Sequence, residues 1–147
     1  GRRLRGGVRL RSPRLALVHS GWRGTLGNIV QEALKALSAA GSRPANLRLW
    51  IGPMICGIHF EVGDEVREAF AQKWPEWAMH WASSGLDLEG IIRRQALEGG
   101  IAREAIFSAN RCTYAEAPHL PSHRREGQSR LTTLFTLAVL RKDGCRE

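Results

Sequence analysis

The spacing of apolar residues along the chain predicts three helices. Over residues 25–40, apolar side chains recur at intervals of three and four residues, which places them on one face of a helix. A similar spacing predicts helices over residues 61–73 and 88–97. Asp87 precedes the third helix and is a suitable N-cap, because its carboxylate can accept a backbone N–H group of the first turn.

Shorter apolar runs between these helices predict strands. Residues 14–19, 47–51 and 105–109 are typical of buried strands, and residues 77–83 alternate large apolar side chains with smaller or polar ones. A last strand is expected over residues 131–140. Strands that alternate with helices predict an α/β domain, in which helices pack against a mixed sheet.

Length and composition predict one domain. A chain of 147 residues is long enough to bury its own core. Residues 1–13 are rich in Arg and Gly and are expected to form a basic arm or an irregular segment, and residues 14–147 the single domain. No apolar run approaches the ~20 residues of a membrane-spanning helix, and the run after the arm is shorter than a signal peptide requires.

The cysteine count and the charge distribution restrict the expected location and partners. Three cysteines are few and odd in number, which favours a reducing, cytoplasmic location over a disulfide framework. The net charge is +8, but removing the six arginines that precede residue 15 leaves only +2 for the rest of the chain. This distribution favours a poorly ordered basic end over a nucleic-acid-binding surface, with a polyanion-binding arm as the alternative.

The segment Val18–Gly24 is the first candidate functional site. His19 ends a predicted strand, and Gly21 and Gly24 flank a Trp-Arg pair. Glycines allow a sharp turn and a close approach to a ligand, and the Arg23 guanidinium can bind an anion through two N–H groups. The equally acceptable alternative is a packed strand end with a core histidine and a surface arginine.

A second candidate site follows Ser122 in a predicted loop over residues 110–130. His123, Arg124 and Arg125 together could clamp an anion, whereas the alternative is a solvated basic loop. With Arg23, these arginines could converge on a phosphate or on the polar groups of a nucleoside.

Metal ligands are the third possibility. Cys56 and His59 are three positions apart and His119 and His123 four apart, and both spacings occur in zinc sites. Because 60 residues separate His59 from His119, a site built from all four is not favoured. Cys112 could be a nucleophile, although a buried inert cysteine is the commoner case. Cys56, His59 and Cys112 are therefore only secondary ligand candidates.

Five segments together resemble the laccase-domain family, also called the YfiH-type or multicopper polyphenol oxidase family. The match runs in order from about residue 14 to about residue 137. The matching segments are Val18–Thr25, Ile51–Pro53 with Phe60–Gly63, Asp87–Leu88, Cys112–Thr113 and Ser122–Arg125.

The resemblance implies a YfiH-like α/β fold shared with a group classed as cysteine hydrolases. It also implies purine nucleoside phosphorylase activity on adenosine, inosine, guanosine and methylthioadenosine, together with adenosine deamination. Copper-dependent polyphenol oxidation is the alternative activity. The implied partners are a purine nucleoside and phosphate, without a membrane, for a monomer or homo-oligomer.

The resemblance also assigns residues. A zinc ion, or copper as the alternative, would be held by two histidines and one cysteine, and His19 would be one of these ligands. His19 and Arg23 are the catalytic candidates. Arg23, His123, Arg124 and Arg125 are the candidates for phosphate or nucleoside contacts.

Two departures from the family pattern change the expected activity. The other two ligands lie upstream of His19 in the family, and residues 1–18 contain neither His nor Cys. Ile58 and His59 stand where many members have a Cys-Cys pair. The chain is therefore expected to be the C-terminal part of such an enzyme, incomplete at the N-terminus, or a degenerate member that does not retain the metal. A non-catalytic domain that binds a nucleoside or a protein partner is the corresponding alternative.

Overall fold

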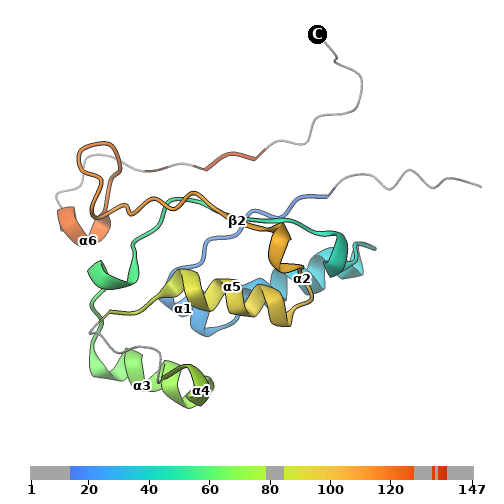
Figure 1. The fold of residues 1–147 in the computed structure, drawn as a ribbon, viewed down its shortest axis with the longest axis horizontal. Coiled ribbons are helices and arrows are strands. Elements are labelled where there is room, and N and C mark those ends of the chain that lie inside the picture. The colour runs from blue at the N-terminus through green and yellow to red at the C-terminus, as the bar shows by residue number, and fades with distance from the viewer. Residues whose placement is uncertain (1–13, 79–84, 128–133, 135, 139–147) are drawn as a thin grey trace, which may run out of the picture.

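A computed structural model describes residues 14–78, 85–127, 134 and 136–138 of the chain (Figure 1). The described residues form helices joined by short 3-10 turns, with two short strands between them. In chain order the elements are α1 (Trp22–Leu26), α2 (Ile29–Ala39), η1 (Pro44–Asn46), β1 (Leu49–Ile51), η2 (Gly57–His59), α3 (Asp64–Lys73), α4 (Pro75–Ala78), α5 (Leu88–Glu98), η3 (Arg103–Ala105), β2 (Ile106–Ser108) and α6 (His123–Glu126).

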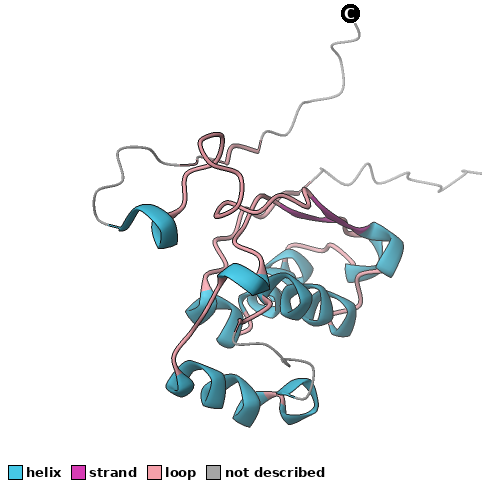
Figure 2. Ribbon diagram, turned by 60° about the vertical axis from the view of Figure 1, so that its left-hand side comes forward, coloured by secondary structure: helices cyan, strands magenta, loops and turns pink. Residues whose placement is uncertain are grey.

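The two strands are parallel and lie on one side of the central helices (Figure 2). Leu49 pairs with Ile106 and Ile51 with Ser108. Apolar side chains from α2, α5 and both strands form the first core cluster, which excludes water from this face of the strands. Its buried members are Val30, Leu34, Ile51, Ile92, Ala96, Ile101 and Ile106.

A second cluster joins α3 to α1 and α5, on the side of the molecule away from the strands (Figure 1). Its buried members are Val66, Phe70, Trp74, Leu86, Leu88 and Ile91, and Trp22, Leu26, Met54, Phe60 and Val62 pack against it. The buried Gln95 side chain on α5 donates to the carbonyl oxygen of Thr25 at 2.7 Å. Burial of apolar surface and this hydrogen bond therefore fix α1 to the central helix.

The three predicted helices are confirmed, and the first two differ from the prediction at their N-terminal ends. Gly27 and Asn28 divide the helix expected over 25–40 into α1 and α2, because Asn28 has a positive φ of 58°. The helix expected from residue 61 begins at Asp64. The N-cap role of Asp87 is confirmed, because its Oδ1 accepts from the Gly90 amide at 3.0 Å.

The predictions for strands are less successful. The strands expected over 47–51 and 105–109 are confirmed as the shorter β1 and β2. The buried strand expected over 14–19 is wrong: the segment has no regular secondary structure and is exposed, with Leu17 60% and Val18 40% accessible. A strand needs a neighbour for its backbone hydrogen bonds, and none pairs with this segment within the described residues.

Other sequence predictions lie partly outside the described residues. The arm expected over 1–13 lies outside the described residues. Most of the strand expected over 77–83 does too, but its first two residues, Trp77 and Ala78, belong to helix α4. Only residues 134 and 136–138 of the strand expected over 131–140 are described, and they are not in a strand. The loop expected over 110–130 contains the short helix α6.

The described architecture is α/β with a small parallel sheet, and it agrees with the expected fold class at that level. The mixed sheet and the relation to cysteine hydrolases stay predictions. None of the helices in the described part of the chain has both the length and the apolar character needed to cross a bilayer.

Candidate functional site

The loops that follow β1 and β2 continue side by side beyond the parallel strands. Met54 forms a bridge with Cys112, in which the Met54 amide donates to the Arg111 carbonyl oxygen and the Thr113 amide to the Met54 carbonyl oxygen, both at 3.1 Å. The carboxyl ends of parallel strands are where ligands commonly bind in α/β folds. The strand pairing therefore brings residues after β1 next to residues after β2.

Two cysteines and a histidine meet between these loops. The sulfur atoms of Cys56 and Cys112 are 3.0 Å apart, and His59 Nδ1 lies 3.0 Å from the first and 3.4 Å from the second. Both cysteines are free and all three residues are half-buried. Such a cluster could hold a metal ion, because thiolates and imidazole are common metal ligands.

The two thiols differ in acidity because one donates a hydrogen bond to the other. Burial raises the pKa of the Cys56 thiol, and donating to Cys112 raises it further. Burial also opposes ionisation of Cys112, but hydrogen bonds from the Cys56 thiol and from backbone amides outweigh it and lower the pKa of Cys112 to about 6. The hydrogen bond between the thiols therefore favours ionisation of Cys112 over ionisation of Cys56.

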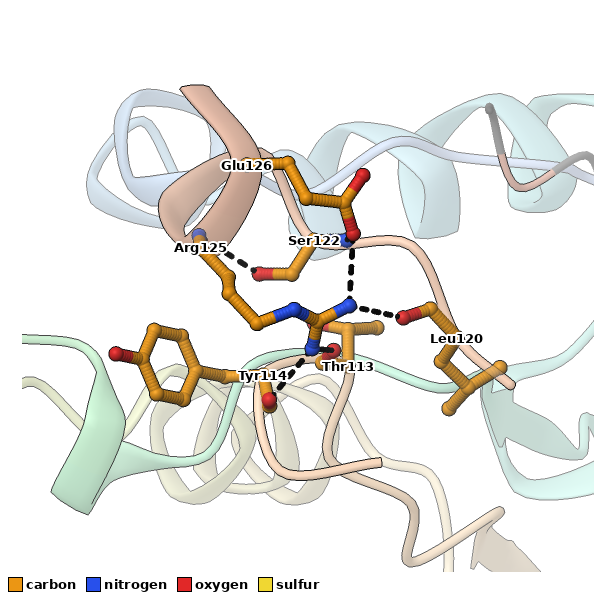
Figure 3. Close-up of polar contacts among 6 residues, drawn as sticks. All are labelled: Thr113, Tyr114, Leu120, Ser122, Arg125 and Glu126. Atoms are coloured by element: carbon orange, nitrogen blue, oxygen red, sulfur yellow. Dashed lines mark hydrogen bonds and ion pairs between the residues drawn. The ribbon is translucent and has the colours of Figure 1, made fainter. Parts of the chain in front are cut away.

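The Arg125 guanidinium fastens α6 to the loop that carries Cys112 (Figure 3). It donates to the carbonyl oxygens of Thr113, Tyr114 and Leu120 at 2.9, 2.6 and 2.7 Å, and it pairs with the Glu126 carboxylate at 2.7 Å. These contacts occupy the guanidinium with acceptors of the protein itself. The geometry therefore favours a positioning role for Arg125, and its predicted phosphate contact stays a prediction.

The two residues before Arg125 in helix α6 face the solvent. Ser122 caps the helix and accepts from the Arg125 amide at 3.4 Å, whereas His123 and Arg124 are exposed. The Arg124 guanidinium lies over the Phe60 ring, 5.2 Å from its centre. His59 of η2 and Tyr114 of the loop after β2 stack with ring centres 4.8 Å apart. Cationic and aromatic groups therefore border the Cys-His cluster on the α6 side.

The first candidate motif lies at the start of α1. His19 and Arg23 are exposed, and the Arg23 guanidinium lies 4.2 Å from the centre of the Trp22 ring. A Cβ atom at Gly21 would lie only 3.2 Å from His19 Nε2, so glycine leaves that nitrogen accessible. His19 belongs to no group of three candidate metal ligands within the described residues.

The candidate metal ligands that lie together in the structure are not the pairs that sequence spacing indicates. Within the described part of the chain, Cys56 and His59 join Cys112, and neither His119 nor His123 belongs to the group. Pairwise spacing misses this arrangement because Cys112 is distant in sequence. The signal that could have found it is positional, since Cys56 and Cys112 each follow one of two adjacent predicted strands.

The sequence model of the multi-copper polyphenol oxidoreductase laccase family matches residues 9–138. Purine nucleoside phosphorylase YfiH of Shigella flexneri is 35% identical over 116 residues, which cover 76% of this chain and 46% of that protein. Adenosine deaminase RL5, from an unknown prokaryotic organism, is 30% identical over 119 residues, covering 77% of this chain and 45% of that protein.

A solved structure has a similar fold. The crystal structure of the hypothetical protein YfiH of Bacillus licheniformis superposes with a TM-score of 0.66 at 28% identity, over 74% of this chain and 43% of that one. The chain thus spans less than half the length of the relatives it matches.

Proposed function

The chain belongs to the multi-copper polyphenol oxidoreductase laccase family, and on that premise we propose that it forms part of a purine nucleoside phosphorylase site. The names of relatives such as the Shigella flexneri protein support phosphorolysis, and the name of RL5 supports adenosine deamination as a second activity. The proposed substrates are adenosine, inosine, guanosine and methylthioadenosine, together with phosphate. Polyphenol oxidation with copper remains the alternative.

The observation that carries the proposal is the combination of cations and aromatic rings at α6. Arg124 lies over Phe60, and His123 is exposed beside it. Arg125 attaches this helix to the loop that carries Tyr114, and the Tyr114 ring stacks on the ring of His59 from η2. Purine rings stack on aromatic faces, and phosphate is held by guanidinium groups, so this combination suits a nucleoside and phosphate.

The proposed reaction is displacement at the ribose. A phosphate oxygen forms a bond to C1′ while the bond from C1′ to the purine nitrogen breaks, and the departing purine takes up a proton. We assign phosphate binding to Arg23, His123 and Arg124, because positioning and charge stabilisation are the main contributions a protein makes to such a transfer. His19, with its accessible ring nitrogen, is the proposed proton donor.

The residues described here do not complete the metal site that the family resemblance implies. That site places zinc or copper at His19 with two further ligands, and His19 lies in no three-ligand group within the described residues. A catalytic zinc site needs about three protein ligands. We therefore derive no step through a metal at His19.

Incubating the chain with inosine and inorganic phosphate tests the proposal. We expect ribose-1-phosphate and free base by chromatography when the chain is joined to the upstream region that carries the other two ligands in the family, and no turnover from the chain alone would then identify it as one part of the site. Arg124→Ala should lower phosphate affinity about tenfold, the value of one charge-assisted contact. Arg103→Ala, another exposed arginine, is the matched control. Release of inosine from adenosine without phosphate would support deamination.

Two results would contradict this function. Saturable nucleoside binding without turnover, even in the joined chain, would favour the non-catalytic binding domain. Neither turnover nor binding, combined with oxidation of a phenol in the presence of copper, would favour the polyphenol oxidase alternative.

A further inference from the structure

We propose that Cys56, His59 and Cys112 form a zinc site that is separate from the metal site the family resemblance places at His19. The inference does not depend on the phosphorolysis reaction, because it rests on the ligand atoms themselves. All three atoms lie within 4.8 Å of one another, and they come from two loops held together by the strand pairing.

The distances are close to those that zinc requires. Two thiolates bound to one zinc at about 2.3 Å each stand roughly 3.8 Å apart in a tetrahedron. The sulfurs of Cys56 and Cys112 are 3.0 Å apart, so they must separate by about 0.8 Å to admit the ion. Side-chain rotation of two half-buried cysteines can supply this movement without a change in the backbone.

The donor atoms determine the class of metal. Two thiolates balance the charge of a divalent ion, and a neutral imidazole adds a nitrogen ligand through Nδ1, which faces both sulfurs. Sulfur and nitrogen donors suit zinc and other soft metals, whereas magnesium and calcium prefer oxygen, and the two balancing charges favour divalent zinc over monovalent copper. Three protein ligands also leave one coordination position for water or an anion, as in catalytic zinc sites.

The surroundings already hold the ligands in place. Tyr114 stacks on the imidazole ring of His59, and the amide of Cys56 donates to Cys112 Sγ at 3.3 Å. The Glu116 carboxylate accepts from the Cys112 amide at 3.1 Å and fixes the start of its loop. Such outer contacts orient metal ligands and reduce the cost of assembling a site.

The chief competing outcome is a disulfide between the two cysteines. A disulfide requires the sulfurs to approach about 2.05 Å, whereas metal binding requires them to separate. The two outcomes therefore move the same atoms in opposite directions. Reducing conditions permit only the second, so the test is carried out on fully reduced protein.

The test is a metal titration of the reduced, chelator-treated chain. We expect one equivalent of zinc to bind in competition with a chromophoric chelator, and cobalt to give a thiolate-to-metal charge-transfer band. Cys56→Ser, His59→Ala and Cys112→Ser should each weaken zinc binding by more than about 100-fold, since even changes outside the first ligand shell cost 10- to 100-fold. Cys145→Ser and His19→Ala are the matched controls and should bind zinc as the unaltered chain does.

The site would be overturned if zinc did not bind stoichiometrically or if the cobalt complex lacked the thiolate band. Displacement of zinc by excess magnesium would also overturn it, as would a loss of zinc binding in His19→Ala equal to that in His59→Ala. The cobalt spectrum is recorded on the unaltered protein, so it tests the thiolate ligands even if a cysteine variant does not fold.

Discussion

Two motifs combine a histidine and an arginine near a glycine: the α1 motif, residues 19–23, and the α6 motif, residues 122–126. They are attached to the rest of the protein by different kinds of contact. The α1 motif is attached through the core: Trp22 packs against the second apolar cluster and Gln95 binds the backbone of Thr25, while Arg23 stays at the surface. The α6 motif has no buried apolar side chain of its own, and its Arg125 serves as the attachment.

The difference shows that an arginine's role depends on which acceptors surround it. Carbonyl oxygens of a short loop accept several hydrogen bonds from one guanidinium, and they are always beside it, whereas a ligand is not. Arg125 has such acceptors in Thr113, Tyr114 and Leu120, whereas Arg23 lies over an aromatic ring. Because the α1 motif is attached through apolar packing, the Arg23 guanidinium stays available to bind a ligand. Because the α6 motif is attached through Arg125, only its His123 and Arg124 side chains stay available.

The largest expected effect comes from removing the core attachment of the α1 motif. Gln95→Ala leaves a cavity and deprives the Thr25 carbonyl oxygen of its buried side-chain donor, so we expect the free energy of unfolding to fall by about 2–4 kcal/mol. Urea denaturation measures the change. Gln72→Ala, an exposed glutamine on α3, is the control and should change it by less than about 0.5 kcal/mol. Equal effects would show that α1 is not attached through Gln95.

Removing the attachment of the α6 motif should cost less. Arg125→Ala breaks the bonds to three carbonyl oxygens and to Glu126, but the arginine side chain is 23% exposed and water can replace part of the loss. We expect a decrease of about 1–3 kcal/mol in the free energy of unfolding, by urea denaturation, and faster hydrogen exchange of the α6 amides.

Arg125→Lys separates charge from shape in the same measurement. Lysine keeps the charge but lacks the planar fork that reaches several acceptors. Arg125→Lys should therefore lower the free energy of unfolding by most of the amount that Arg125→Ala does. Full stability in Arg125→Lys would mean that the charge alone holds α6.

The fold was predictable where local sequence determines structure. Helices α3 and α5 followed from apolar spacing and from the cap at Asp87, because both signals lie within the segment. The segment over 14–19 has the composition of a strand, but strand formation depends on a partner elsewhere in the chain. The break at Asn28 was also missed, because a positive φ at a non-glycine residue has only a weak sequence signal.

The site was predictable in its members but not in its grouping. Cys56, His59 and Cys112 were candidates from their residue types, yet only the pairing of β1 with β2 shows that they meet. The attachment role of Arg125 depends on carbonyl oxygens, which every residue carries, so no residue type indicates it. Sequence thus identifies chemically able side chains, and tertiary structure decides which of them are already engaged.

A pH-dependent effect distinguishes the two cysteines of the cluster. Because the pKa of Cys112 is lowered to about 6, its thiolate is present above that pH and is lost as the pH falls through it. Alkylation of the metal-free, reduced chain by iodoacetamide, followed residue by residue with mass spectrometry, should therefore approach its maximal rate at Cys112 near neutral pH. Cys56, whose pKa is raised, should require more alkaline solution. Identical pH profiles for the two cysteines would contradict the hydrogen bond between them.

The smallest expected effect on stability is that of Arg23→Ala. The side chain is exposed and its ring contact is with the adjacent Trp22, so we expect the free energy of unfolding to change by about 0.5 kcal/mol or less in urea denaturation. If Arg23 is available for phosphate, the same variant should weaken phosphate binding about tenfold, the loss of one charge-assisted contact. Arg103→Ala should change neither quantity. If instead Arg23→Ala destabilised the chain as much as Arg125→Ala does, the α1 motif would also be attached through its cation, and the contrast between the two motifs would not hold.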